Sequence, residues 1–263
     1  ETFRKMGVQG QIGFVNVLQP NDPITNSAED VKACELAEAC FTHWFYDPVL
    51  KGEYPAELLA MAQTALGVPV FAPGDAELMK NNICDFIGVN YYKREMVAAN
   101  YDVDGFEMNT SGQKGSGKEL GWKGLFKLVR NPNGRYTDWD WEIYPEGLTD
   151  AIMRINKRYG NVPIYITENG LGAKDPIVNG EVLDQPRIDY LREHIQATGE
   201  AIKLGADVRG YYPWSFIDLL SWLNGYQKQY GFVYIDQANG LARKKKLSFG
   251  WYQDVIRSNG EKL

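Results

Sequence analysis

The sequence predicts an α/β fold built on parallel strands, and two observations support that prediction. Short apolar, β-branched runs alternate along the chain with longer amphipathic stretches, which is the pattern of βα units. Each run is largely apolar or aromatic, as expected for parallel strands that are covered on both faces. The four predicted strands are Gln11–Val17, Asp85–Tyr92, Pro163–Thr167 and Val208–Phe216.

Helical patterns fill the spaces between these strands. Ser27 is a favourable N-cap for the first helix. The predicted helices are Ala28–Phe45, Pro55–Leu66, Ala76–Asn81, Pro145–Tyr159, Gln185–Leu204 and Phe249–Ser258. The stretch Asp102–Pro132 is rich in Gly, Ser, Asn and Lys, which predicts a long functional loop with a short element near Gly121–Val129. Four strands with their helices make half of an eight-stranded barrel, in a single domain spanning residues 1–263.

Composition excludes several classes of function. A net charge of −6 argues against binding nucleic acid or an anionic membrane through the overall field. The basic run Arg243–Lys246 is too short to reverse this, and it is predicted to be a solvated loop before the last helix. The three cysteines, Cys34, Cys40 and Cys84, have no metal-like spacing, and their odd number favours a reducing cytoplasm. No metal or cofactor is predicted.

The strand ends carry the residues that point to chemistry. In an α/β barrel the catalytic groups lie at the carboxyl ends of the strands. The second predicted strand ends at Tyr92, Glu168 follows the third, and Trp214 lies near the end of the fourth. A carboxylate, a phenol and an indole at one mouth suit the cleavage of a glycoside. On spacing alone, however, a lone Glu after an apolar strand is more often a loop residue or a helix cap.

Several longer motifs carry a family resemblance. The run Pro163–Gly170, Pro-Ile-Tyr-Ile-Thr-Glu-Asn-Gly, resembles the nucleophile signature of family 1 glycoside hydrolases, which are retaining β-glycosidases on a (β/α)8 barrel. Three further segments agree in order and spacing: His43–Pro55, Phe86–Tyr92 and Trp141–Leu148. The resemblance covers essentially the full chain. It implies the C-terminal half, strands 5–8, of a (β/α)8 TIM barrel.

The resemblance also implies roles for individual residues. Glu168 would be the catalytic nucleophile, and Tyr92 would donate a hydrogen bond to it. Trp214 would be the platform for the sugar. Trp139 and Trp141, with the loop Asp102–Pro132, are expected to shape the leaving-group side.

One departure from the family pattern predicts the substrate. Ordinary β-glucosidases of this family carry a Glu at the position of Ser221 and bind the outer hydroxyls of the sugar with it. Together with Lys228 and Tyr230, Ser221 instead resembles the phosphate site of the 6-phospho-β-glycosidases. A sugar phosphate carries nearly two negative charges, so a carboxylate there would repel it and a lysine would attract it. Taken singly, each of these residues has an ordinary structural explanation.

The choice between gluco and galacto substrates stays open. Trp222 resembles the residue of phospho-β-galactosidases, but phosphoglucosidases are diverse at this position, so 6-phospho-β-glucosidase is only slightly favoured. The family's acid/base Glu lies in an Asn-Glu-Pro motif, and the chain contains none. The expectation is therefore a fragment without normal activity, whose partner is the N-terminal half of the barrel. Self-association could instead cover the exposed barrel edges. The alternative hypotheses are a half-barrel module that binds sugar phosphates without cleaving them and an unrelated α/β protein.

Overall fold

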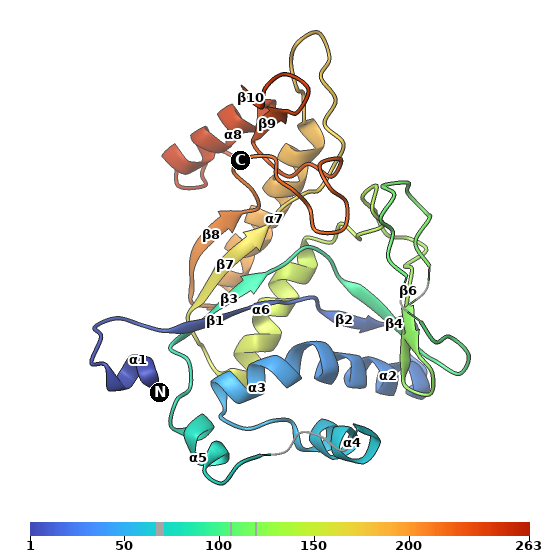
Figure 1. Cartoon of the computed structure of the whole chain (residues 1–263), viewed down its shortest axis with the longest axis vertical. Helices are drawn as coiled ribbons and strands as arrows, with labels where there is room; N and C mark the ends of the chain where they lie inside the picture. Colours follow the sequence, from blue (N-terminus) through green and yellow to red (C-terminus); the bar gives the residue numbers. More distant parts are fainter. Residues whose placement is uncertain (67–70, 106, 119) are drawn as a thin grey trace.

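A four-stranded parallel sheet forms the centre of the computed structural model, which describes residues 1–66, 71–105, 107–118 and 120–263. The strand order is β1-β3-β7-β8, and every neighbouring pair is parallel (Figure 1). The four strands are β1 Gly13–Val17, β3 Phe86–Asn90, β7 Ile164–Asn169 and β8 Val208–Pro213. The prediction of an α/β fold with these parallel strands is confirmed, although β8 ends three residues earlier than expected.

Helices cover one face of this sheet. The main core joins Leu148, Ile152 and Ile155 of α6 to Ile87 and Ile166 of the strands. These apolar side chains recur every three or four residues, so they form one stripe of α6. The helices are α1 Thr2–Lys5, α2 Ala28–Glu38, a π-helical turn at Ala39–His43, α3 Trp44–Leu50, α4 Ala56–Leu66, α5 Asp75–Lys80, α6 Glu146–Tyr159, α7 Gln185–Lys203 and α8 Leu247–Arg257.

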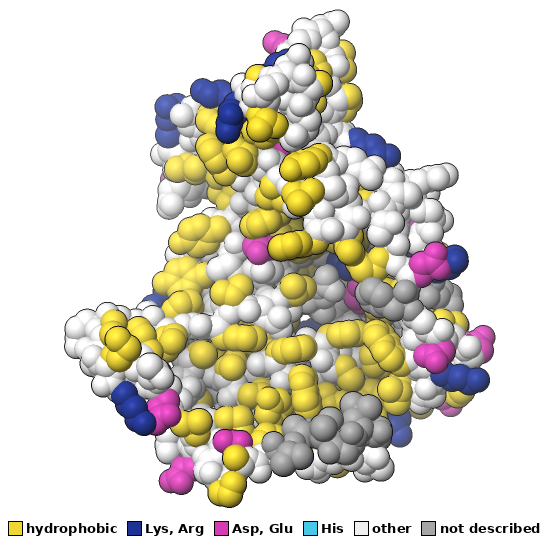
Figure 2. Space-filling model, in the orientation of Figure 1, with side chains coloured by type: hydrophobic (Ala, Val, Ile, Leu, Met, Phe, Trp, Pro, Cys, Tyr) yellow, Lys and Arg dark blue, Asp and Glu magenta, His cyan; other side chains and the backbone are white. Residues whose placement is uncertain are grey.

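The opposite face of the sheet is open. Val15 and Val17 of β1 are 48% and 44% exposed, and Tyr212 of β8 is 55% exposed. Figure 2 shows hydrophobic side chains gathered over the middle of the molecule, where the sheet lies in Figure 1. Among the described residues, β1 pairs only with β3 and β8 only with β7, so each outer strand has one unpaired edge. Unpaired edges of this kind invite another strand.

A register shift in β7 decides which way its last residues point. Val89 of β3 is opposite Ile166, but Asn90 is opposite Glu168, so Thr167 is an extra residue in the ladder. Side chains of a strand alternate between faces, and one inserted residue reverses that alternation. Ile166 is buried towards the helices, and Glu168 therefore faces the open side instead.

A second sheet forms beside the first and was largely missed by the sequence prediction. Its order is β2-β4-β6-β5. Ala33 and Ala37 of α2 pack on it in one cluster with Val97 of β4. The strands are β2 Asn21–Pro23, β4 Glu95–Ala99, β5 Leu120–Trp122 and β6 Phe126–Val129. The element predicted near Gly121–Val129 is thus confirmed as an antiparallel pair. The other two strands are short, and their sequences lack a clear period of two.

Two sequence-based predictions, the end of the first helix and the loop at the basic run, were wrong for physical reasons. The first helical stretch continues through its π-helical turn and past Pro48 to Leu50, because Tyr46 and Asp47 are buried against the rest of the fold. The basic run is not a solvated loop: its first three residues lie in β10 Ala242–Lys245, which pairs with β9 Val233–Asp236, and Lys246 is buried. No helix in the described part of the chain is long and apolar enough to cross a bilayer.

A buried carboxylate joins α3 to α6. Arg158 binds Asp47 through two nitrogens, at 2.9 and 2.5 Å, and Tyr159 donates to the same carboxylate at 2.6 Å. Burial alone would raise the pKa of Asp47, but these hydrogen bonds outweigh it and hold the pKa below its usual range.

Replacing Asp47→Asn should therefore destabilise the chain by about 2 kcal/mol at neutral pH, because charge-assisted hydrogen bonds are lost. Because folding depresses the pKa of Asp47, the difference from wild type should begin to shrink as the pH falls below about 4 and should vanish below the pKa of the folded state. Urea unfolding at both pH values measures this. The exposed two-nitrogen pair of Arg135 with Glu193 is the control, and Glu193→Gln should cost less than about 1 kcal/mol. Equal losses for both variants would contradict the assignment.

Candidate active site

Glu168 and Tyr92 meet at the carboxyl ends of β7 and β3. The Tyr92 hydroxyl donates a hydrogen bond of 2.6 Å to Glu168 Oε2. Burial raises the pKa of Tyr92, and the hydrogen bond to Glu168 raises it further, so Tyr92 stays a neutral donor. No described residue hydrogen-bonds to the second oxygen of this half-buried carboxylate, which faces the open side of the sheet. This arrangement fixes the direction of a carboxylate while leaving it reactive.

A buried layer beneath Glu168 holds the strand ends in place. Asn169 is fully buried and donates to the Tyr91 carbonyl at 2.8 Å, while Tyr211 donates to the amide oxygen of Asn169 at 2.5 Å. Tyr190 of α7 donates to the Tyr92 carbonyl at 3.1 Å. The polar groups of this layer are satisfied inside the fold, which makes the position of Glu168 rigid.

Trp214 lies beside the tail of the Glu168 strand. Its backbone N–H donates to the Asn169 carbonyl at 2.9 Å. The chains approach so closely that a Cβ at Gly170 would lie 1.8 Å from the Trp214 carbonyl oxygen. The structure therefore brings the backbone of Trp214 to the same strand end as Glu168 and Tyr92, and Trp214 is half-buried there.

Lys228 is the unusual residue of the site. Its side chain is 1% exposed, and its ammonium lies over the Trp141 ring, 3.5 Å from the centroid. The rings of Trp139 and Tyr230 are also near it, at 5.1 and 5.6 Å. In the described part of the chain, no carboxylate is within ion-pairing distance of this ammonium. Among the described residues the charge is stabilised by aromatic faces, which are a weak substitute for a counter-ion.

The surroundings of Lys228 shift its acidity. Burial lowers the pKa of Lys228 to about 7, and repulsion from Lys93 adds to that effect. Burial raises the pKa of Tyr230. The interaction with Ser221 lowers it, and the charge of Glu168 raises it. Tyr230 is therefore close to both Ser221 and Glu168, and its ring lies near the Lys228 ammonium. A cation with no counter-ion among the described residues, next to the Tyr230 ring, is suited to an anionic ligand.

The turn that carries Ser221 is partly open. Two backbone hydrogen bonds of 2.9 Å join Ser221 to Gly225, and the Ser221 hydroxyl donates to Asn224 Oδ1 at 3.3 Å. Trp222, which was predicted to bind substrate, is 98% exposed and packs against nothing in this structure. The structure thus groups Ser221 with the other site residues but does not bring Trp222 onto them.

A cleft opens beside the indoles, with a volume of about 270 Å³. Its walls include Trp139, Trp141 and described parts of the long loop, such as Met108 and Asn109. Trp141 is also in ring contact with Tyr92, at 5.3 Å between centroids. Trp141 therefore lies between this cleft and the pair of Tyr92 and Glu168, neither of which lines the cleft. Within the described ranges, no group of three or more His, Cys, Asp or Glu could hold a metal ion.

Sequence reasoning missed three residues of this region. Lys93 also lies over Trp141, 6.0 Å from the centroid, and its position directly after Tyr92 at a strand end was an available signal. Gly172 packs against Lys228 and Tyr230, and its place four residues after Glu168 was the only hint. Lys246 lies behind the site in a buried ion network, and the basic run around it concealed this role.

The fold is part of an α/β barrel with a parallel sheet, and comparison with known proteins shows its family. Residues 1–261 match the model of glycosyl hydrolase family 1, and the chain belongs to that family. It is 44% identical to the aryl-phospho-β-D-glucosidase BglC of Bacillus subtilis, covering 100% of this chain and 56% of the relative. It is 40% identical to a 6-phospho-β-galactosidase of Leptotrichia buccalis, and the match covers 96% of this chain and 56% of the relative.

Solved structures show the same relationship. A β-glucosidase from Exiguobacterium marinum superposes with a TM-score of 0.83 at 33% identity, covering 98% of this chain and 54% of that one. A family 1 β-glucosidase from Thermotoga maritima superposes with a TM-score of 0.82 at 30% identity, covering 97% of this chain and 52% of that one. The chain spans about half the length of the relatives it matches.

The close packing of Gly172 gives a test of the site. A Cβ there would lie 2.4 Å from Lys228 Cε and 2.9 Å from Tyr230 Cζ, and both partners are buried. Gly172→Ala should therefore cost about 1–3 kcal/mol in denaturant unfolding, because a well-packed site must shift. Gly199→Ala is the control, because α7 has open space at Gly199, and it should stabilise the chain by about 0.5–1 kcal/mol. If both variants were stabilising, the packing around Lys228 would be looser than described.

Proposed function

We propose that the chain is the nucleophile-bearing half, strands 5–8, of a retaining 6-phospho-β-glucosidase. Glu168 is the nucleophile, Tyr92 orients it, Trp214 carries the sugar ring, and Ser221, Lys228 and Tyr230 hold the 6-phosphate. The observation that carries this proposal is Lys228, a cation buried against aromatic rings with no carboxylate partner in the described residues. The names of the related phospho-glycosidases support it.

The electrostatics of Lys228 favour a phosphorylated ligand. Burying an unpaired ammonium is unfavourable, and it lowers the pKa of Lys228 to about 7. A phosphate placed against the ammonium supplies the missing counter-charge, and the bound complex then favours the protonated lysine. The hydroxyls of Ser221 and Tyr230 supply further donors to the phosphate oxygens. An unphosphorylated sugar offers no such compensation.

The chemistry of Glu168 follows from its geometry. Its carboxylate attacks the anomeric carbon, the bond to the leaving-group oxygen breaks, and a covalent glycosyl ester forms. The hydrogen bond from Tyr92 directs one oxygen and leaves the other to attack. A second carboxyl group must protonate the leaving group and later activate water, at roughly 5–5.5 Å from the first. With no Asn-Glu-Pro in this chain, we assign that group to the complementary half of the barrel.

The open side of the sheet accommodates such a partner. The unpaired edges of β1 and β8 are those that barrel closure would use. An apolar groove of about 550 Å³ lies beside β8, between Tyr212, Phe216 and Tyr252. We propose that the complementary half covers these surfaces, with self-association of the chain as the substitute when that half is absent. The three free cysteines fit a reducing cytoplasm.

The galacto alternative has support from the relatives, because both gluco- and galacto-specific phospho-glycosidases are among them. Trp222, the residue on which the sequence-based choice turned, is solvent-exposed here. We retain 6-phospho-β-glucosidase as the proposal and 6-phospho-β-galactosidase as the second candidate. Turnover of aryl 6-phospho-β-glucoside against aryl 6-phospho-β-galactoside separates the two.

The phosphate assignment predicts the effect of restoring the carboxylate. In the chain combined with its complementary half, Ser221→Glu should lower kcat/KM for an aryl 6-phospho-β-glucoside about 100-fold through charge repulsion. The plain aryl β-glucoside should change far less. Ser221→Ala is the control, and it should weaken the phosphorylated substrate only about tenfold through one lost hydrogen bond. Equal effects of Ser221→Glu on both substrates would refute the phosphate site. Normal turnover by the chain alone would refute the assignment of the acid to the other half.

A further inference from the structure

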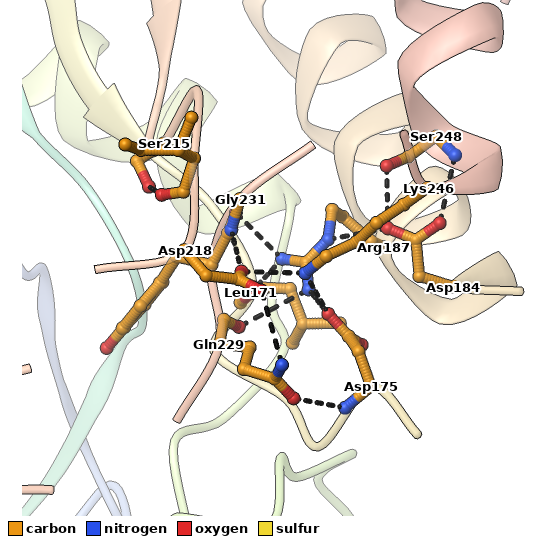
Figure 3. A network of polar contacts seen from close by, with 12 residues as sticks. Leu171, Asp175, Asp184, Arg187, Ser215, Asp218, Gln229, Gly231, Lys246 and Ser248 are labelled. Carbon is orange, nitrogen blue, oxygen red and sulfur yellow. Dashed lines mark hydrogen bonds and ion pairs between the residues drawn. The ribbon is translucent and has the colours of Figure 1, made fainter. Parts of the chain in front are cut away.

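We propose that Lys246 is a positioning residue for the phosphate pocket, although it lies outside that pocket. This inference rests on the proposed function and deepens it. Two of the three residues that would hold the phosphate, Lys228 and Tyr230, belong to the short segment Lys228–Gly231. A buried ion network built around Lys246 and Arg187 holds that segment from its other side (Figure 3).

Lys246 joins two loops that follow different strands. Its ammonium donates to Asp175 Oδ2 at 2.5 Å and to Asp218 Oδ1 at 2.7 Å, and its side chain is completely buried. Asp175 lies in the loop after β7, and Asp218 lies in the loop after β8. Lys246 itself stands between β10 and α8, so one ammonium ties three parts of the chain together.

Arg187 of α7 completes the network. Its guanidinium pairs with Asp175, and with Asp184 at 2.8 Å, and it is 1% exposed. It also donates to the carbonyl oxygen of Tyr230 at 3.0 Å and to that of Gln229 at 3.3 Å. A planar guanidinium with several donors can hold this many acceptors in one geometry.

The network forms hydrogen bonds with every residue of the segment after Lys228. Asp218 Oδ1 accepts from the Gly231 N–H at 2.9 Å. The Gln229 side chain accepts from the Asp175 N–H at 2.8 Å and donates to Asp218 Oδ2 at 3.2 Å. Side chains of an extended segment alternate, so Gln229 faces the network while Lys228 and Tyr230 face the aromatic pocket. The network therefore fixes the backbone that aims both phosphate-binding side chains.

Loss of Lys246 would unbalance the network. It contains two cations, Lys246 and Arg187, against three carboxylates. Without the lysine, Asp218 keeps no cation within ion-pairing distance among the described residues. A buried carboxylate in that state draws in water or a proton, and the loop that it supports moves. Because Lys246 does not touch the pocket, its effect on a phosphate must pass through the segment.

The test is calorimetric titration of glucose 6-phosphate into this 263-residue chain, at a temperature where near-ultraviolet circular dichroism shows each variant fully folded. Lys246→Met should weaken binding about tenfold or more, because small displacements of positioned groups have large effects. Lys246→Arg, which keeps the charge, should retain affinity within about threefold. The neighbouring exposed residue gives the matched control, Lys245→Met, which should bind as wild type does.

A second variant decides the matter if Lys246→Met does not fold. Gln229→Ala leaves all the ion pairs in place and removes only the side-chain hydrogen bonds of the segment, so we expect about threefold or greater weakening. Unchanged affinity in Gln229→Ala, or in folded Lys246→Met with a lowered melting temperature, would overturn the positioning role. If Lys228→Met abolished binding in that case, the phosphate site itself would stand. A wild-type chain that did not bind glucose 6-phosphate would overturn both proposals.

Discussion

The register between β3 and β7 is the constraint on which the site depends. The extra residue Thr167 reverses the alternation of β7, so Glu168 faces the open side of the sheet where the Tyr92 hydroxyl meets it at 2.6 Å. Without that shift, a carboxylate would point into the apolar layer between sheet and helices, where burying a charge is very unfavourable. The buried Asn169 then holds the shifted strand end in place.

Buried charge is treated in two different ways on the two sides of one short segment. Behind it, Lys246 and Arg187 are paired with carboxylates, which is how proteins normally tolerate buried ions. In front of it, Lys228 is left against aromatic rings. Among the described residues Lys228 has no carboxylate partner, and this contrast is the reason for the proposal that its cation serves an anionic ligand.

How far the sequence predicts this structure depends on the range of the interactions involved. The parallel strands and covering helices follow from local apolar periodicity, and the strand-end position of Glu168 follows from them. The bulge at Thr167 and the burial of Lys246 depend on contacts between distant segments, which local pattern does not record. The same holds for the helix that passes Pro48, where tertiary packing outweighs the local preference. Trp222 shows the reverse case, a residue chosen by resemblance that the structure leaves in solvent.

The most direct measurement is covalent labelling of the nucleophile. The chain, combined with its complementary half, is incubated with 2-deoxy-2-fluoro-β-glucosyl fluoride 6-phosphate, whose glycosyl ester hydrolyses slowly, and the labelled peptide is identified by mass spectrometry. We expect one sugar phosphate attached to Glu168, and much slower labelling by the unphosphorylated reagent. A label on another residue, or equal labelling by both reagents, would contradict it.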